Sequence, residues 1–302
     1  MHNFTVSNPN TIRRLIEKNK DDIKEITLRV KDPDIFLSDM LSDLKDDADW
    51  PYAVNPALIV NTDDEDEVRL RARNIVEMSI EQDVFGLNFL DFGCGEGHVA
   101  AEVLARGARK VVAHDIKAGD KWPTLSEQGN LLYTTDWKQV VENAPYDFIL
   151  IYDVLDHVMN RDPKDVLSDL SKLLNKDGFI SVRFHPWISR HGSHLYTQLN
   201  KAYAHLIFDD EKLKRCGYEV TPMRKVVHPM MTYKNWIQKA GLSVVKEDKI
   251  QEPVEDFFLK NDLLKSMIQK HFKNSPMEEY KEGKGDLSRV MSFHFCDFVL
   301  AR

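Results

Sequence analysis

Residues suited to binding a ligand follow an apolar run in the first third of the chain. The run LNFLDF (87–92) contains Asp91 and leads into a turn with Gly93, Gly95 and Gly97, after which HVAAEVLARG has helical spacing. A glycine turn lets the backbone approach a ligand closely, and the N–H groups of a helix N-terminus favour an electron-rich group. The spacing Gly-x-Gly-x-Gly differs from the dinucleotide fingerprint Gly-x-Gly-x-x-Gly, so the turn alone does not identify the nucleotide.

Acids stand at the ends of the next apolar runs. Asp115 ends VVAHD about twenty residues after the glycines, where a carboxylate can accept the hydroxyls of a ribose. Asp136 and Trp137 follow NLLYTT, where an acid can accept from an exocyclic amine and an indole can cover a purine, although Asp136 is equally suited to cap the next helix. Asp153 ends YDFILIYD. Together these positions indicate an adenosyl ligand.

The elements that must position these residues alternate between strand and helix. Such alternation predicts a parallel sheet with helices on both faces, in which the carboxyl ends of the strands share one edge. The expected elements are a helix at about 63–79, strands at 87–92, 110–116, 130–135, 146–153 and 179–184, helices at 98–107, 137–144 and 163–178, then a helix at 232–242 and strands at 243–250 and 290–302.

This series of motifs resembles the class I S-adenosylmethionine-dependent methyltransferases. The matching pieces are LDFGCGEG, VVAHDI, TTDW, YDFILIYDVLDHV and LSKLLNKDGFISVRF, in that order over about residues 86–185, with AGLSVVKEDKI and FHFCDFVLAR similar to the last strands of the family. The resemblance implies an α/β, Rossmann-like fold with a seven-stranded, mostly parallel sheet whose last strand is antiparallel. It also implies S-adenosyl-L-methionine as the cofactor.

The resemblance assigns cofactor contacts to particular positions. Asp91 and the turn around Gly93 and Gly95 would receive the methionine part, and Asp115 would receive the ribose. The remaining positions implied to contact the cofactor are Cys94, Gly97, Ile116, Asp136, Trp137 and Asp153. Acidic side chains suit a ligand that carries an ammonium and a sulfonium but no phosphate.

The segment HPWISRHGSHLY, directly after the expected fifth strand, contains candidate catalytic residues. We expect His185 or His191 to act as general base, because imidazole titrates near neutral pH, with Arg190, His194 and Tyr196 orienting a polar acceptor. The histidine spacing matches no metal motif, so we predict no metal site. A structural alternative is a buried lid helix whose apolar stripe consists of Leu195, Leu199, Ala202 and Leu206.

Charge and composition limit the possible partners. The formal net charge is −8, and residues 1–85 carry 11 basic and 19 acidic side chains against 30 and 30 in the remainder. An acidic N-terminal third argues against a protein that neutralises many phosphates of a nucleic acid. The 3 cysteines are widely spaced, and the sequence contains no apolar run of about 20 residues, so we expect a cytoplasmic protein that makes no membrane contact.

These observations predict an N-terminal helical extension at 1–62 and a methyltransferase domain at 63–302 with a lid insertion at about 185–230. The expected function is methyl transfer to a small polar acceptor, most simply an oxygen of a sugar, glycan or other metabolite. Three alternatives remain open at this level: methylation of tRNA or DNA, an inactive cofactor-binding assembly or regulatory protein, and a nicotinamide-dependent oxidoreductase on a similar sheet.

Overall fold

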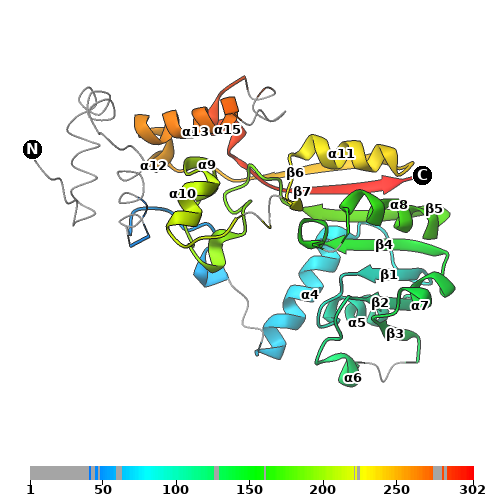
Figure 1. Cartoon of the computed structure of the whole chain (residues 1–302). Coiled ribbons are helices and arrows are strands. Elements are labelled where there is room, and N and C mark those ends of the chain that lie inside the picture. The colour runs from blue at the N-terminus through cyan, green and yellow to red at the C-terminus, as the bar shows by residue number, and fades with distance from the viewer. Residues whose placement is uncertain are drawn as a thin grey trace, which may run out of the picture. The chain divides into compact units, whose positions relative to one another are not determined.

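A seven-stranded sheet carries the glycine turn (Figure 1). In this computed structural model the strands lie in the order β3-β2-β1-β4-β5-β7-β6. The first five strands pair in parallel, and β7 runs antiparallel to β5, which confirms the predicted sheet. The strands are β1 (Asn88–Phe92), β2 (Lys110–His114), β3 (Leu131–Thr134), β4 (Tyr146–Tyr152), β5 (Leu174–Phe184), β6 (Ser243–Gln251) and β7 (Phe293–Ala301).

The structure describes residues 41, 45–46, 48–58, 63–125, 129–159, 161–220, 222, 225–274, 281 and 284–302. Most of the extension expected at 1–62 therefore lies outside the described residues. In its described part, a short 3-10 helix, η1, spans Pro56–Leu58.

Helices flank the sheet, with α4 packed against α5 and α8 packed against α11. Their N-termini follow the capping signals in the sequence: Asp64 accepts hydrogen bonds from Asp66 N and Glu67 N at the start of α4, and Asp162 caps α8 ahead of Pro163. These elements are α4 (Glu65–Ser79), α5 (His98–Ala105), α6 (Trp122–Leu125), α7 (Trp137–Glu142), η2 (Leu155–His157), α8 (Pro163–Leu173) and α11 (Met230–Lys239).

Apolar side chains from the strands and from α4 and α5 make the core beneath the glycine turn. Phe89 of β1 and Phe148 of β4 stack with ring centroids 5.3 Å apart, and both are buried. Ile75 and Val76 of α4 and Val103 of α5 belong to the same cluster. Burial on this scale fixes the strand ends where the candidate ligand-binding residues stand.

The chain divides into two units, each made of separate segments. The sheet unit contains 59–185, 230–250 and 295–302, and the helical unit contains the segments up to 58, 186–229 and 251–294. The described helices of the helical unit are η1, η3 (Leu195–Thr197), α9 (Ala204–Ile207), α10 (Asp210–Arg215), α12 (Asp256–Leu259), α13 (Asp262–Asn274) and α15 (Leu287–Val290).

Two elements differ from their sequence-based bounds. The helix expected at 163–178 ends at Leu173, and β5 begins at Leu174, five residues before the expected strand. The apolar stripe expected on one lid helix is buried at all four positions, but the segment forms η3 and α9 instead. Tyr203, in the left-handed region at φ 57°, separates these two short helices.

Candidate functional site

Two cavities lie at the carboxyl edge of the sheet, beside the glycine turn. The first, the turn cavity, is lined by the glycine turn together with Arg71, Asp91 and Tyr152. The second, the edge cavity, is lined by residues that follow β2, β3 and β4, namely Asp115, Ile116, Thr135, Trp137, Asp153 and His157. Gly93 lines both, so one elongated ligand can contact both cavities across this glycine.

The glycine turn has a backbone that only glycine adopts readily. Gly93, Gly95 and Gly97 have φ values of 82°, 51° and 87°. A Cβ on Gly93 would lie 2.3 Å from a methyl carbon of Val154, whereas a Cβ on Gly95 would meet no atom within 4 Å. Gly95 therefore borders open space, which is the arrangement that a bound ligand requires.

Asp91 provides a buried negative group in the turn cavity. Its side chain is buried, and its Oδ2 makes no hydrogen bond with any described residue. Burial, and next the charge of Asp115, raise the pKa of Asp91 to about 7. Such a carboxylate gains most from a ligand that brings its own positive charge.

Asp115 connects the glycine turn to the end of β2. Its Oδ2 accepts a hydrogen bond of 2.9 Å from Gly95 N, and its Oδ1 accepts one of 3.3 Å from Lys117 N. Ile116, next in sequence, is 82 % exposed and lines the edge cavity. An exposed isoleucine beside an aromatic residue of the same cavity, Trp137, is well placed to pack against a purine ring.

Asp136 and Trp137 of the TTDW motif have different surroundings in the structure. Trp137 lines the edge cavity and packs edge-on against Phe92 and His114, with centroids 6.1 and 5.6 Å away. Asp136 is absent from the lining of both cavities, and its Oδ1 accepts a hydrogen bond from Lys138 N at the start of α7. The structure thus gives Asp136 the capping role that the sequence left open.

Cys94 lines the turn cavity as a neutral thiol. Burial, followed by the charges of Asp91 and Asp115, raises its pKa far above the ordinary value. A thiol held neutral in this way is a poor nucleophile, so Cys94 packs in the site without reacting.

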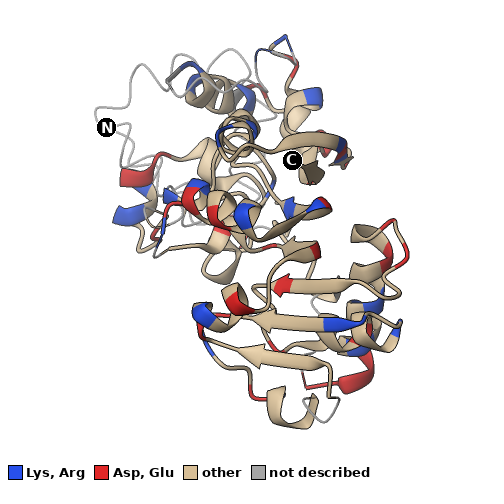
Figure 2. Ribbon diagram, turned by 90° about the vertical axis from the view of Figure 1, so that its right-hand side faces the viewer, with Lys and Arg blue, Asp and Glu red and all other residues tan. Residues whose placement is uncertain are grey.

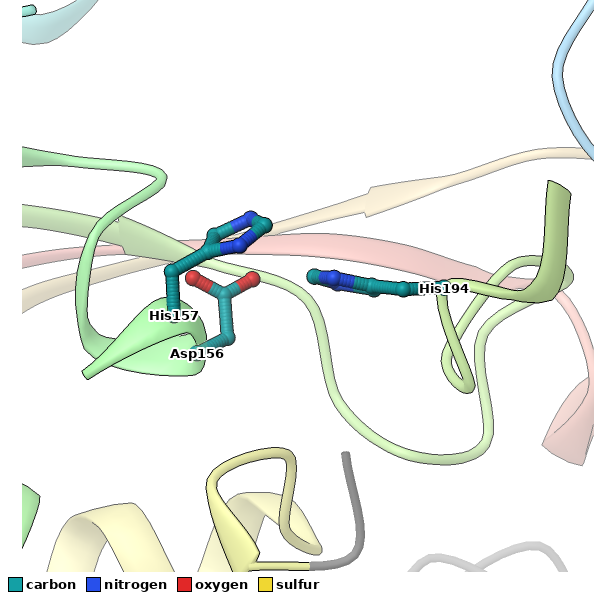
Figure 3. A group of neighbouring side chains, drawn as sticks. All are labelled: Asp156, His157 and His194. Atoms are coloured by element: carbon teal, nitrogen blue, oxygen red, sulfur yellow. The ribbon is translucent and has the colours of Figure 1, made fainter. Parts of the chain in front are cut away.

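His185 forms a pair with a buried acid within the sheet unit. Its Nδ1 lies 2.7 Å from Asp156 Oδ2, and both side chains are buried. Asp156 comes from η2, directly after β4, and Figure 3 shows it beside His157 at neighbouring positions of that helix. A carboxylate at Nδ1 fixes the tautomer of the imidazole, so Nε2 carries the lone pair in the neutral ring.

The other predicted catalytic residues belong to the helical unit. Arg190 forms ion pairs with Glu255 and, at 3.2 Å, with Glu252. The ring of Tyr196 lies 6.2 Å from that of His191 and 6.0 Å from that of His194, the third residue labelled in Figure 3. The structure therefore groups His191, His194 and Tyr196 and leaves Arg190 bound to glutamates.

Several lining residues were not predicted from the sequence. Arg71 and Tyr152 line the turn cavity, and Val154 supports Gly93 from the segment after β4. Arg71 lies in α4, 22 residues before the glycine turn, and a basic residue in an amphipathic helix gives no local signal of function. Only the packing of α4 against α5 brings it to the cavity.

The residues present fit the cofactor that the sequence implied. The Asp91 oxygen that lacks a hydrogen bond suits an α-ammonium, and Arg71 suits an α-carboxylate. The open space at Gly95 admits the chain that joins this amino-acid group to a ribose, and Asp115 suits the ribose. No phosphate-binding arrangement is needed for such a ligand.

Comparisons with known proteins give the family. The family model described as "Methyltransferase domain" matches residues 64–247. No curated protein matches the sequence. Among solved structures, a SAM dependent methyltransferase from Archaeoglobus fulgidus has 16% identity and a TM-score of 0.44, covering 79% of this chain and 95% of that one.

Two further structures show the same level of similarity. A cyclopropane synthase from Mycobacterium tuberculosis has 17% identity and a TM-score of 0.48, covering 90% of this chain and 95% of that one. The magnesium protoporphyrin IX methyltransferase from Synechocystis, with bound SAH, has 15% identity and a TM-score of 0.44, covering 78% and 83%. Because the family model spans more than half of the sequence, the chain belongs to the class I S-adenosylmethionine-dependent methyltransferases, with S-adenosylmethionine as its cofactor.

Proposed function

We propose that this methyltransferase modifies an oxygen of a small polar acceptor, such as a sugar, glycan or other hydroxyl-bearing metabolite. The observation that supports this proposal is the 2.7 Å contact between His185 Nδ1 and Asp156 Oδ2 at the edge of the sheet. A hydroxyl must lose its proton as the new bond forms, and an imidazole oriented by a carboxylate is suited to remove it.

The residues of the chain have separate roles in this reaction. When bound, S-adenosylmethionine supplies the electrophilic methyl group. Asp156 holds the His185 ring, and Nε2 of His185 would accept the proton of the acceptor hydroxyl as the oxygen bonds to the methyl carbon. The methyl–sulfur bond of the sulfonium would break in the same step, and the leaving group would be the neutral thioether S-adenosylhomocysteine. The proton ends on the imidazole, and the nearby carboxylate of Asp156 stabilises the imidazolium that results.

His185 is the preferred base over His191. His185 follows β5 directly and has a buried carboxylate as its partner, whereas His191 packs against the ring of His294, with centroids 4.8 Å apart. A second imidazole orients a base less firmly than a carboxylate does, because it carries no fixed negative charge.

The test is methyl transfer from tritium-labelled S-adenosylmethionine to a panel of sugars, phenols, hydroxy acids, amines and bulk tRNA. We expect label in hydroxyl acceptors. We also expect His185→Gln and Asp156→Asn to lower turnover by about 10²-fold or more, because general-base catalysis contributes roughly 10²–10⁴-fold. Binding of S-adenosylhomocysteine by calorimetry should change little in either variant.

The control is His228→Gln, since the His228 ring contacts Lys225 O and lines neither cavity. It should retain wild-type turnover. Label confined to tRNA or to amines, or His185→Gln with turnover close to wild type, would reject the proposed reaction.

The setting of the protein is part of the same proposal. None of the helices in the described part of the chain is long and apolar enough to cross a membrane. Cys94, Cys216 and Cys296 are free thiols, which supports a reducing compartment such as the cytoplasm.

A further inference from the structure

His114 is the last residue of β2, and it lines the edge cavity directly before Asp115. Its side chain is buried, and its ring lies 5.6 Å from the ring of Phe92 and 5.6 Å from that of Trp137, measured between centroids. Trp137 is the aromatic residue of this cavity that is placed to cover a purine, together with the exposed Ile116. A polar ring therefore lies next to the expected position of the base.

The hydrogen bonding of His114 fixes its tautomer. Its Nδ1 lies 3.0 Å from the carbonyl oxygen of Thr134, the residue opposite it in the register of β2 and β3. A carbonyl oxygen only accepts, so the neutral ring carries its proton on Nδ1 and its lone pair on Nε2. Burial lowers the pKa of His114, although the hydrogen bond to Thr134 and the charges of Asp115 and Asp136 act to raise it. At slightly alkaline pH the ring is therefore neutral, and Nε2 is an acceptor only.

The Nε2 atom of His114 is open to the edge cavity. It makes no hydrogen bond with any described residue, and it is not among their buried nitrogen and oxygen atoms that lack a partner. It is thus an exposed atom on a residue of which only 7 % is exposed. Because His114 lines the edge cavity, a ligand that brings an N–H group into this cavity gains a hydrogen bond to that lone pair.

The acid that the sequence implied for the adenine amine is engaged elsewhere. Asp136 lines neither cavity, and its Oδ1 accepts a hydrogen bond from Lys138 N. Asp115 lines the edge cavity, but its two oxygens accept from Gly95 N and Lys117 N, and it is suited to the ribose. The base therefore needs a different acceptor.

Other nitrogen and oxygen acceptors on side chains of the edge cavity fit the amine less well. Asp153 and His157 follow β4, which is separated from β2 by β1. Thr135 follows β3, beside β2, but a hydroxyl both donates and accepts and so does not distinguish an amine from a carbonyl. His114 combines a place beside Trp137 with a fixed acceptor.

We propose that Nε2 of His114 accepts a hydrogen bond from the exocyclic amine of the adenine, and that through this bond His114 selects an adenosyl ligand over an inosyl one. An inosyl ligand has a carbonyl in place of the amine, so two lone pairs would face each other. The ring does not relieve this contact by moving its proton to Nε2, because Thr134 O holds the proton on Nδ1. The inference rests on the cofactor site and not on the identity of the methyl acceptor.

The experiment measures by calorimetry, at about pH 8, the Kd of S-adenosylhomocysteine and of S-inosylhomocysteine, in which a carbonyl replaces the amine. The quantity compared is the ratio of the two Kd values, because a substitution that only disturbs the fold weakens both ligands alike. We expect the wild type to bind S-adenosylhomocysteine roughly tenfold more tightly, the effect expected when a buried acceptor is left without its donor.

Substitutions of His114 should abolish this selection. His114→Phe keeps an aromatic ring against Phe92 and Trp137 but has no acceptor, so it should weaken S-adenosylhomocysteine about tenfold and change S-inosylhomocysteine little. His114→Gln, whose amide both accepts and donates, should bind both ligands with a reduced ratio. The ligand 5′-methylthioadenosine, which has the same base but lacks the amino-acid end, should lose the same factor as S-adenosylhomocysteine in His114→Phe.

Two further variants test the other polar residues near the base. Asp136→Ser keeps an N-cap oxygen for α7 but shortens the side chain that the sequence implied for the amine. Thr135→Val removes the neighbouring hydroxyl and keeps the size of the side chain. Both variants should keep the wild-type ratio.

The outcomes are distinct. A wild type that binds the two ligands equally, or a ratio that persists in His114→Phe and His114→Gln, overturns the inference and leaves the family and the proposed acceptor untouched. A ratio that falls to the same extent in Asp136→Ser or Thr135→Val overturns it as well, because His114 is then not the selecting residue. A wild type that binds neither ligand overturns the cofactor site and the inference together. Because His114→Gln retains a polar side chain, it decides the matter even if His114→Phe does not fold.

Discussion

Asp91 and Arg71 give the turn cavity both signs of charge. Asp91 is a buried carboxylate whose Oδ2 has no hydrogen bond within the described structure, and Arg71 forms no ion pair with any described residue. A zwitterion that places its ammonium at Asp91 and its carboxylate at Arg71 satisfies both residues. The α-amino acid group of S-adenosylmethionine has these two charges on one carbon.

Arg71→Ala and Asp91→Asn should each weaken S-adenosylhomocysteine about tenfold or more, since a charge-assisted hydrogen bond contributes roughly 1.5–3 kcal/mol. Neither should change the Kd of 5′-methylthioadenosine. Arg69→Ala is the matched control, because Arg69 lies in the same helix and pairs with Glu65 at the surface. Equal weakening of both ligands would show instead that the substitutions distort the whole site.

The pH dependence of this site follows from the raised pKa of Asp91. The ionised acid binds the ammonium, so affinity should rise as the pH passes upward through about 7 and then level off. Asp91→Asn, which cannot ionise, should lose this part of the profile. A raised pKa also means that the free energy of unfolding of the ligand-free protein falls as the pH rises from the unfolded-state pKa of 3.8 to about 7. In this range the native state retains a proton that the unfolded state has released.

At the level of single residues, the sequence locates the parts of the site that lie within one motif. Asp91, the glycines, Asp115 and Trp137 each line at least one of the two cavities, because each lies at or shortly after the end of a parallel strand that a buried core holds in place. Arg71 could not be found in this way. It comes from α4, and only the packing of α4 against α5 brings it to the turn cavity.

At the level of elements, the start of α5 depends on Gly97. This glycine has φ 87°, and a Cβ at the position would lie 2.2 Å from Cε1 of Tyr133. Tyr133 OH donates a hydrogen bond of 2.8 Å to Gly97 O, so the ring is held against the turn and cannot move aside freely. The turn, the helix start and β3 are thus fitted to one another.

Gly97→Ala should lower the free energy of unfolding by about 3 kcal/mol, combining about 1–2 kcal/mol for a left-handed alanine with about 1–3 kcal/mol for overpacking. Gly86→Ala is the matched control, because Gly86 has φ 76° but its Cβ would meet nothing within 4 Å. It should show only the conformational cost of about 1–2 kcal/mol. Urea denaturation of both variants measures the difference, and equal losses would mean that Tyr133 adapts.

The element predictions succeeded where the period of apolar residues was unambiguous. The resemblance to the family implied the antiparallel last strand, and the alternation of strands and helices predicted the rest of the sheet. It failed at 174–178, where LNKDG continues the helical pattern of α8, although pairing with Tyr146 makes Leu174 the first residue of β5. Tertiary pairing decided this boundary, and local propensity did not.

At the level of the whole molecule, charge argues against a nucleic-acid partner. The formal net charge is −8, and Figure 2 shows basic segments interspersed with acidic ones along the described ribbon. A protein that neutralises many phosphates loses affinity steeply as salt rises, and this chain offers too little positive excess for that behaviour.

We therefore expect no measurable salt-dependent binding of tRNA or of a duplex DNA between about 50 and 200 mM salt. A plot of the logarithm of the binding constant against the logarithm of the salt concentration, whose slope counts phosphate contacts, should show no steep fall. Fluorescence anisotropy with a labelled tRNA measures this directly. A polybasic protein of similar size serves as the positive control. A steep negative slope for this chain would restore the nucleic-acid alternative.

The strand order has a further consequence for how the sheet is completed. β7 lies between β5 and β6 but follows β6 in the chain, so β6 is synthesised before the strand that joins it to the sheet. An unpaired strand is a template for association with other chains. β6 carries the run Lys246, Glu247, Asp248 and Lys249. Charged side chains disfavour intermolecular pairing of β6 before β7 has been synthesised. They have the same effect in the folded protein, where β6 is an edge strand of the sheet.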